Sequence, residues 1–260
     1  MVGKIPVALQ MFSVRHELGQ DFKGTLKAVK DAGYTGVEFF GMPMHPAGEI
    51  RTMLEELDLA CAGWHVPFEL VQADKLDETI AFHKELGNKY LIIPGIPEEF
   101  RKTRADWLKL AQFFNELSDK LAEHGMLTGY HNHAVEFQEL DGELPWDTFF
   151  QNTKKPVIMQ LDLGNAMVGG VEVLPILEKY RGRATTIHLK PYSFAAGKDD
   201  PRAGYRPVIG EDDVPWHEVF EICEADGTEW YIVEYESDAY PPLEAVRKCL
   251  EAIKQLQAAR

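Results

Sequence analysis

The stretch Ala122-Glu-His-Gly125-Met-Leu-Thr-Gly-Tyr130-His-Asn-His133 joins a helical pattern to a short apolar run with a polar end. Gly125 accepts the left-handed backbone that ends a helix, and an apolar run this short predicts a buried strand. His131 and His133 share parity, so in an extended chain they point to the same side. Two imidazoles and the amide of Asn132 are costly in a core and useful in a site. We therefore expect a functional site at the end of this strand.

The same unit, a helix that ends at glycine and an apolar strand that ends in polar residues, recurs along the chain. Copies have Gly33 before residues 37–40, Gly87 before 90–93 and Gly227 before 230–233. The pattern predicts eight strands, at residues 5–12, 36–40, 60–65, 89–93, 126–131, 157–162, 184–189 and 229–234. It also predicts helices near residues 20–32, 47–58, 74–87, 104–124, 145–152, 171–180, 215–226 and 241–258, with a capping box at Thr103 and Asp106.

Alternation of strands and helices implies parallel strands joined by right-handed crossovers. Eight such units with nearly continuous apolar strands predict an α/β fold, a closed (β/α)8 TIM barrel, as a single domain over residues 1–260. An open, doubly wound sheet is the alternative, but no GxGxxG motif follows the first strand. The longest loop, residues 191–213, is rich in charged residues and glycine, which is typical of a lid or binding loop.

Composition narrows the class of partner. The chain has 260 residues, 45% of them hydrophobic, which suffices for one large core. Its formal net charge of −15 disfavours a nucleic-acid partner, because phosphate backbones need clustered cations. Three cysteines without CxxC spacing predict reduced thiols. No apolar run reaches membrane-span length and the N-terminus lacks a signal-like core, so we expect a cytoplasmic protein without a membrane partner. A homo-oligomer is compatible with the sequence.

Active sites of (β/α)8 barrels lie at the carboxyl ends of the strands, so the residues at those ends are the candidates. Seven of the eight predicted strands end in polar groups: Gln10, Glu38, His65, His131 with Asn132 and His133, Asp162 with Asn165, His188 with Lys190, and Glu234 with Glu236. His131, Asp162, His188 and Glu234 come one each from strands five to eight. Such a mixed nitrogen and oxygen set suits Mn, Zn, Co or Fe(II) better than Ca, and a cysteine-free shell is typical of catalytic sites.

Each of these residues also has a purely structural explanation. His188 and His65 are alternatively core histidines bonded to backbone, and Asp162 is alternatively a turn residue. Glu234 is alternatively half of a buried salt bridge, because an unpaired carboxylate is costly inside a strand. Glu136 and Glu236 are expected to be solvated loop residues. The candidates are stronger together, because the structural explanations would all have to coincide at one rim.

Several motifs resemble the sugar phosphate isomerase/epimerase family with the xylose isomerase-like TIM barrel, over essentially the whole chain. They are Leu9-Gln-Met-Phe-Ser-Val-Arg15, Gly36-Val-Glu-Phe-Phe40, His65-Val-Pro67, Tyr130-His-Asn-His-Ala-Val-Glu-Phe137, Leu161-Asp-Leu-Gly164, His188-Leu-Lys190, Ile209-Gly-Glu-Asp-Asp-Val-Pro-Trp216 and Val233-Glu234. The resemblance implies one divalent metal ion, Mn foremost, with Zn, Co, Mg or Fe as other fits. Relatives usually supply Glu, Asp, His and Glu. Asp162, His188 and Glu234 match the last three, and His131 stands where the first Glu is found.

The resemblance implies an isomerase or epimerase of a sugar or sugar phosphate, which moves a proton next to a metal-polarised carbonyl. Epimerases of the family use two metal-bound carboxylates on opposite faces of the substrate. Because His131 replaces one of them, a one-sided reaction is the alternative, such as dehydration of a keto-sugar or keto-inositol. Glu234 or His131 is then the base, His65 or Lys190 protonates the leaving oxygen, and Glu38 completes the catalytic set. The expected substrate-binding residues are Gln10, Asn132, His133, Asn165 and Arg206.

Two further hypotheses remain. Apurinic-site DNA endonucleases share the fold family, but Ile93-Pro94-Gly95 lacks their histidine and Gly204-Tyr-Arg206 lacks two further ligands. A non-catalytic sugar-binding barrel would need a broken metal shell, and the shell is complete in the sequence. The basic residues of the long loop, Arg206 included, are suited to grip a phosphate or carboxylate, or else balance nearby acidic residues.

Overall fold

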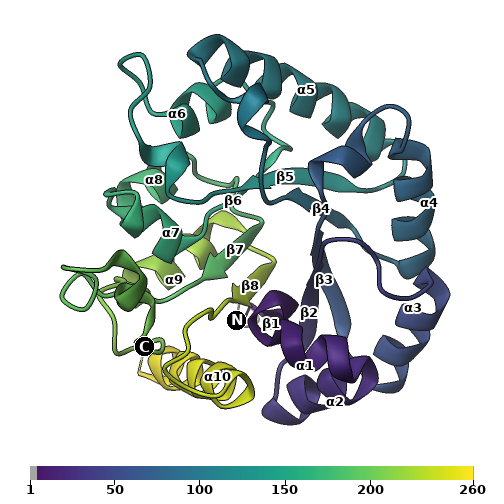
Figure 1. The fold of residues 1–260 in the computed structure, drawn as a ribbon, viewed down its shortest axis with the longest axis vertical. Helices are drawn as coiled ribbons and strands as arrows, with labels where there is room; N and C mark the ends of the chain where they lie inside the picture. The colour runs from purple at the N-terminus through teal and green to yellow at the C-terminus, as the bar shows by residue number, and fades with distance from the viewer. Residues whose placement is uncertain (1–4, 260) are drawn as a thin grey trace.

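The computed structural model describes residues 5–259, and eight parallel strands form the centre of the molecule. They are β1 (Val7–Gln10), β2 (Gly36–Phe40), β3 (Ala60–His65), β4 (Tyr90–Ile93), β5 (Leu127–His131), β6 (Ile158–Gln160), β7 (Thr186–Leu189) and β8 (Trp230–Val233). Their order around the sheet is β6-β5-β4-β3-β2-β1-β8-β7, so sequential strands are neighbours and β1 pairs with β8 (Figure 1). The predicted TIM barrel is confirmed, and each predicted strand is present: β2 and β3 have the predicted bounds, and the other six strands are slightly shorter.

The barrel closes between β6 and β7 through few contacts. An isolated parallel bridge pairs Asp162 with His188, and the His188 amide donates to the Leu161 carbonyl at 2.9 Å. Lower in the barrel, the Met159 amide donates to the Arg183 carbonyl at 2.8 Å. The guanidinium of Arg183 is buried and donates to the carbonyls of Phe150, Lys154 and Val157, which ties the segment before β6 to the segment before β7.

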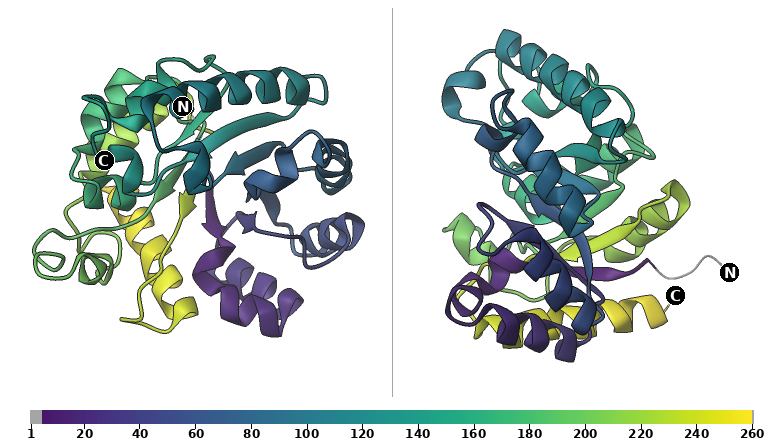
Figure 2. Two further views of the ribbon diagram at one scale, coloured as in Figure 1. Left: turned by 45° about the horizontal axis from the view of Figure 1, so that its top comes forward. Right: turned by 90° about the vertical axis from the view of Figure 1, so that its right-hand side faces the viewer.

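Helices surround the barrel (Figures 1 and 2). They are α1 (Arg15–Gln20), α2 (Phe22–Ala32), α3 (Ala47–Glu56), α4 (Leu76–Leu86), α5 (Arg104–Ala122), α6 (Pro145–Phe150), α7 (Leu163–Val168), α8 (Val173–Lys179), α9 (Trp216–Asp226) and α10 (Pro242–Ala258). Short 3-10 turns follow several strands: η1 (Met11–Val14), η2 (Phe68–Val71), η3 (Glu98–Phe100), η4 (Val135–Phe137) and η5 (Pro201–Tyr205). Gly33 and Gly87 end α2 and α4 in the left-handed conformation, as expected. The capping box of Thr103 and Asp106 is also present.

The barrel interior is apolar below and polar above. Its lower part holds two small buried clusters, Ala8, Ala62 and Ile232 in one, and Tyr90, Ile92 and Ile158 in the other. Because side chains of a strand alternate, the next inward position on each strand lies two residues further on. Ile232 is thus followed by Glu234, and Ile158 by Gln160. The apolar lower part supports a polar layer at the carboxyl ends of the strands.

The cysteines and the helix lengths bear on two further expectations. Cys61, Cys223 and Cys249 are free thiols. Within residues 5–259, none of the helices combines the length and the apolar character that a bilayer crossing requires.

Candidate active site

Four side chains from four neighbouring strands meet at the polar end of the barrel. His131 ends β5, Asp162 is the N-cap residue directly before α7, His188 lies on β7, and Glu234 follows β8 directly. One ligand atom from each lies within 4.8 Å of the others, and all four residues are buried. The Asp162 Oδ2 atom is 4.0 Å from His131 Nε2 and 3.8 Å from His188 Nδ1. This buried group of imidazoles and carboxylates can hold a metal ion.

The two carboxylate oxygens of Asp162 differ, because one caps a helix and the other has no hydrogen bond among the described residues. Its Oδ1 atom accepts the Asn165 amide at 2.7 Å and thereby caps α7, as the turn explanation anticipated. Its Oδ2 atom is buried without any hydrogen bond among the described residues. Burial, reinforced by the charge of Glu234, raises the pKa of Asp162 to about 7. A buried carboxylate oxygen with no donor fits a cation, because an orphaned charge is costly.

Gln160, a residue not singled out from the sequence, holds two of the histidines. Its Nε2 atom contacts Glu38 Oε1 at 2.8 Å, and a carboxylate oxygen requires a donor there. The other end of the amide is therefore the acceptor, and it lies 2.7 Å from His65 Nε2 and 3.1 Å from His131 Nδ1. Both of those ring nitrogens must carry the proton. Burial lowers the pKa of both imidazoles, so they are neutral, and His131 Nε2 presents a lone pair towards Asp162.

His188 lies between two carboxylates. Its Nε2 atom is 2.7 Å from Glu38 Oε2, and its Nδ1 atom is 2.6 Å from Glu234 Oε2. Burial alone would lower the pKa of His188, but Glu38 and Glu234 raise it to about 10. Burial would raise the pKa of Glu38, but His65 and His188 hold it below its usual value. Gln10 also donates to Glu38 Oε2, at 2.7 Å, so Glu38 is saturated with donors and orients the histidines.

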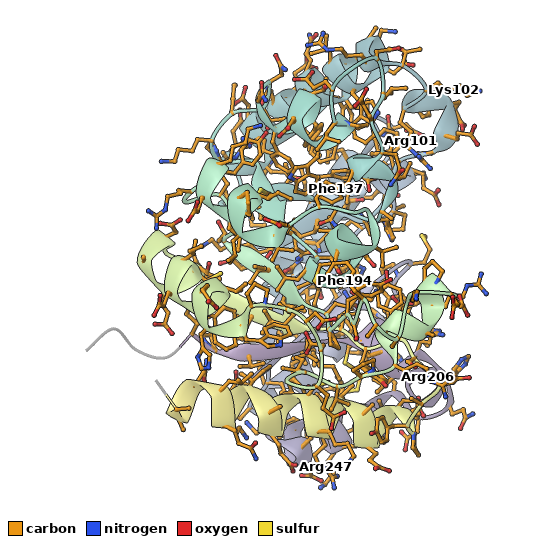
Figure 3. The ribbon with its side chains drawn as sticks, turned by 90° about the vertical axis from the view of Figure 1, so that its left-hand side faces the viewer. Arg101, Lys102, Phe137, Phe194, Arg206 and Arg247 are labelled. Atoms are coloured by element: carbon orange, nitrogen blue, oxygen red, sulfur yellow. The ribbon has the colours of Figure 1, made fainter. Side chains whose placement is uncertain are left out.

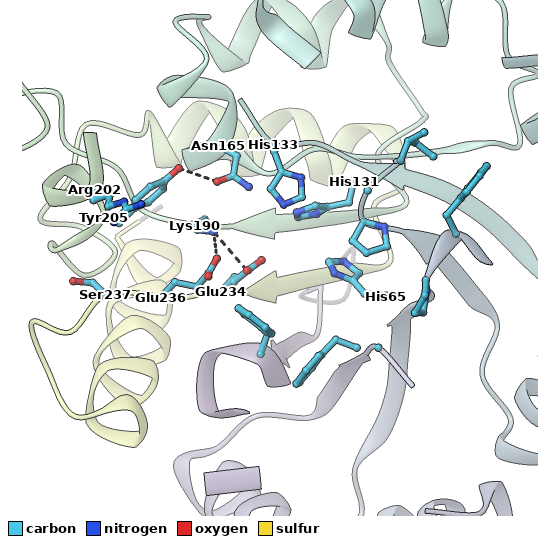
Figure 4. Close-up of a pocket in the computed structure, with 18 of the residues that line it drawn as sticks. His65, His131, His133, Asn165, Lys190, Arg202, Tyr205, Glu234, Glu236 and Ser237 are labelled. Carbon is cyan, nitrogen blue, oxygen red and sulfur yellow. Dashed lines mark hydrogen bonds and ion pairs between the residues drawn. The ribbon is translucent and has the colours of Figure 1, made fainter. Parts of the chain in front are cut away.

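Lys190 forms the cationic part of the site. Its Nζ atom is 3.5 Å from Glu234 Oε1, 3.9 Å from Asp162 Oδ2 and 2.5 Å from Glu236 Oε1. Burial would lower the pKa of Lys190, but these carboxylates raise it, so the amine is an ammonium. Lys190 in turn holds the pKa of Glu234 well below its usual value, against the effect of burial. Figure 4 shows this group facing the histidines.

A cavity of about 1110 Å³ opens above these residues. Three of the residues predicted to bind substrate, His133, Asn165 and Arg206, line this cavity. Tyr205 donates to Asn165 Oδ1 at 2.9 Å. Asn132 instead lies beneath the cavity wall. Its side chain accepts the Asp162 amide at 2.7 Å and donates to the Asp162 carbonyl at 3.1 Å. Asn132 therefore positions the Asp162 backbone, much as Gln10 supports Glu38.

The two glutamates expected to be solvated differ from each other. Glu236 is exposed, yet it lines the cavity and pairs with Lys190. The expectation for Glu136 was wrong, because its side chain is buried and accepts the Tyr130 hydroxyl at 2.6 Å and the His133 amide at 2.7 Å. Glu136 lies three residues after His133, a spacing at which a carboxylate caps a turn, and this signal was available in the sequence.

The fold and this polar centre define a TIM barrel with a buried His/Asp/Glu group that can bind metal, at the position where barrel enzymes have their active sites. The model of the xylose isomerase-like TIM barrel family matches residues 26–256, and the chain belongs to this family.

Inosose dehydratases are among its relatives. That of Histophilus somni is 30% identical over 287 aligned positions, and that of Clostridium perfringens is 28% identical over 277, each covering 92% of both chains. A crystal structure described as a sugar phosphate isomerase/epimerase, from Parabacteroides distasonis, has a TM-score of 0.81 and 24% identity, covering 98% of this chain and 94% of that one. The relatives by sequence thus include proteins named as dehydratases, and the structural match shows that the fold is shared.

Proposed function

We propose that the protein is a metal-dependent lyase that removes water from a keto-inositol or a related keto-sugar. We choose this reaction because of one observation. The Glu234 Oε1 atom of a carboxylate and the Lys190 Nζ atom of an ammonium lie 3.5 Å apart on one side of the site. An elimination needs a base for the proton next to the carbonyl and an acid for the leaving hydroxyl. The names of the inosose dehydratase relatives support the same reaction and suggest an inosose as substrate.

We assign the metal ion, Mn²⁺ foremost, to His131, Asp162, His188 and Glu234. The fit rests on the orphaned Asp162 oxygen and on a donor set of nitrogen and oxygen atoms. When bound, the ion would supply a Lewis acid that polarises the substrate carbonyl. The tautomer that Gln160 imposes leaves the Nε2 lone pair of His131 free for this purpose.

In the proposed reaction Glu234 takes the proton from the carbon beside the carbonyl. The carbon–oxygen bond to the neighbouring hydroxyl then breaks, and Lys190 donates the proton that converts this hydroxyl to water. A proton transfer from Glu234 to Lys190 restores both groups. His65 is a weaker acid candidate, because its Nε2–H donates to Gln160 and burial lowers its pKa. We assign His65 as a hydrogen-bond acceptor for a substrate hydroxyl and Glu38 as the group that orients His188.

An isomerase or epimerase is the second candidate. Epimerisation needs a second base on the opposite face of the substrate, and His133 is the group suited to that task. Its imidazole lines the cavity, and its centroid lies 5.4 Å from that of His131.

The two reactions are distinguished by incubating Mn²⁺-loaded protein with an inosose and with ketohexoses in D₂O. We expect loss of water and an enone or dione product by NMR and ultraviolet absorbance, absent after chelation and in Glu234→Gln. Deuterium incorporation at carbon without loss of water would refute the lyase and support the isomerase or epimerase. Purified protein that folds normally but binds no metal would support sugar binding alone.

A further inference from the structure

The wall of the cavity has a polar half and an apolar half, formed by different strands of the barrel. The residues that follow β5 to β8 are mostly polar or charged, including His133, Lys190 and Glu236. The lining residues at or after the ends of β1 to β4 are mostly apolar. This apolar wall consists of Phe12, Phe40, Pro67, Phe68, Pro94, Ile96 and Pro97. Figure 4 shows Asn165, Tyr205 and Glu236 near Lys190 and Glu234. The candidate metal ligands all belong to the polar half.

The cavity is larger than one carbohydrate ring needs. Its volume of about 1110 Å³ lies just above the usual range for pockets that hold drug-sized ligands, roughly 300–1,000 Å³. A single ring bound at Glu234 and Lys190 would leave the apolar wall uncovered. Phe12, Phe40 and Phe68 are only partly buried, so their rings retain surface that a ligand can remove from water.

The aromatic rings of this wall are held in fixed positions. Phe12 and Phe40 meet edge to face with centroids 5.0 Å apart. Phe68 packs against Phe100 and Phe113, with centroids 5.6 Å and 5.4 Å away. Rings fixed in this way offer apolar faces and edges to another flat ring without first losing conformational freedom.

We propose that the keto-inositol or keto-sugar substrate is joined to an aromatic or similarly flat apolar group, which packs on Phe12, Phe40 and Phe68. A second sugar ring fits this half less well, because among its described lining residues only His65 and Glu69 have polar side chains. Hydroxyl groups buried there would lose water without gaining partners. This assignment rests on the proposed carbohydrate function and names the class of substrate.

The test compares the binding of phenyl β-D-glucoside and methyl β-D-glucoside to the Mn²⁺-loaded full chain by titration calorimetry. We expect the phenyl compound to bind at least tenfold more tightly, because the phenyl ring covers apolar surface in the cavity. Equal affinities, or no binding of the phenyl compound up to its solubility limit, would overturn the proposal. Neither ligand has a keto group, so the result does not depend on turnover. A phenyl preference without any lyase activity would refute the proposed reaction alone.

Two variants locate the effect. Phe68→Ala should bring the affinity ratio of the two glucosides close to one. If that variant does not fold, Phe68→Leu replaces it, because leucine keeps more packing volume. The affinity ratio should then be smaller than in the unchanged protein. Phe194→Ala is the matched control, because Phe194 is 54% exposed and lies outside the cavity lining, on the loop after β7 (Figure 3). An undiminished preference in a folded Phe68 variant would contradict the assigned position of the phenyl ring.

Discussion

Replacing Gln160 with methionine tests whether one buried amide sets the protonation pattern of the site. Methionine is similar in length and shape but has neither the donor nor the acceptor of the amide. The change removes the contacts to His65, His131 and Glu38, and a fourth to Thr186 Oγ1 at 3.0 Å. His131 would then be free to move its proton from Nδ1 to Nε2, the nitrogen that faces Asp162.

The expected cost follows from the partners that remain. His65 Nε2 keeps Glu38 Oε2 at 3.2 Å, and Glu38 keeps Gln10 and His188. Within residues 5–259, no second acceptor lies within hydrogen-bond distance of His131 Nδ1, so an N–H that stays there is left without a partner, at a cost of about 1–3 kcal/mol. Three further lost hydrogen bonds at about 0.5–1.5 kcal/mol each bring the expected loss of unfolding free energy to roughly 3–7 kcal/mol. Loss of a partner that orients a metal ligand typically weakens metal binding about 10–100-fold.

Three measurements apply to the folded variant: urea unfolding, Mn²⁺ affinity by calorimetry, and the tautomer of His131 by ¹⁵N NMR. The matched control is Gln138→Met, because Gln138 is exposed and its side-chain amide donates to a backbone carbonyl, that of Gly169, and not to a residue of the site. A Gln160→Met protein with unchanged metal affinity and an intact Nδ1–H tautomer would refute the role assigned to the amide. Destabilisation alone would show a packing role but not an orienting one.

Other perturbations address the metal, the base and the stability of the barrel. Saturating Mn²⁺ at about 100 times its dissociation constant should stabilise the fold by about 2.7 kcal/mol, seen as a higher melting temperature that Asp162→Asn abolishes. Glu234→Gln should lower turnover at least about 100-fold, measured by product absorbance, because it removes the proposed base. Burial lowers the pKa of His83 to about 4, so the unfolded chain binds this proton more readily. Stability should therefore fall by about 3 kcal/mol as the pH drops from about 6.5 to 4, and urea titrations of His83→Asn should show less of this dependence. Arg183→Met should cost about 3 kcal/mol or more in urea unfolding, because it strands the buried carbonyls of the segment before β6.

The fold followed from local signals. Glycines at helix ends and short apolar runs with polar ends are set by backbone conformation and by burial, and both act over a few residues. The six-residue helix α7 was not anticipated, because Leu163–Val168 is too short for a visible helical period. Asp162, the cap of this helix, was nevertheless recognisable in the sequence. Its role in the turn does not exclude a role as metal ligand, because Oδ1 accepts the Asn165 amide and Oδ2 has no hydrogen bond among the described residues.

The sequence did not indicate which polar residues line the cavity and which only orient their neighbours. Gln160 shares its parity with Asp162, so its inward direction was predictable. Its partner Glu38 lies 122 positions away along the chain, and their contact depends on how the barrel closes. The same holds for Gln10, which supports Glu38 from a neighbouring strand. Parity predicts which side chains enter the barrel, but only the register across strands decides which of them reach the cavity.

The position of the candidate metal ligands within the barrel has a physical consequence. The ladder of paired strands runs from β6 through β1 to β7, and the remaining junction is bridged by Asp162 and His188, which are themselves two of the four candidate ligands. An ion held by both residues would add a bond across the least connected junction of the sheet. Metal binding and closure of the barrel are then parts of one equilibrium, since binding to the closed state alone stabilises it. The expected rise in melting temperature with Mn²⁺ therefore arises at this junction, where hydrogen exchange of the His188 amide should slow most.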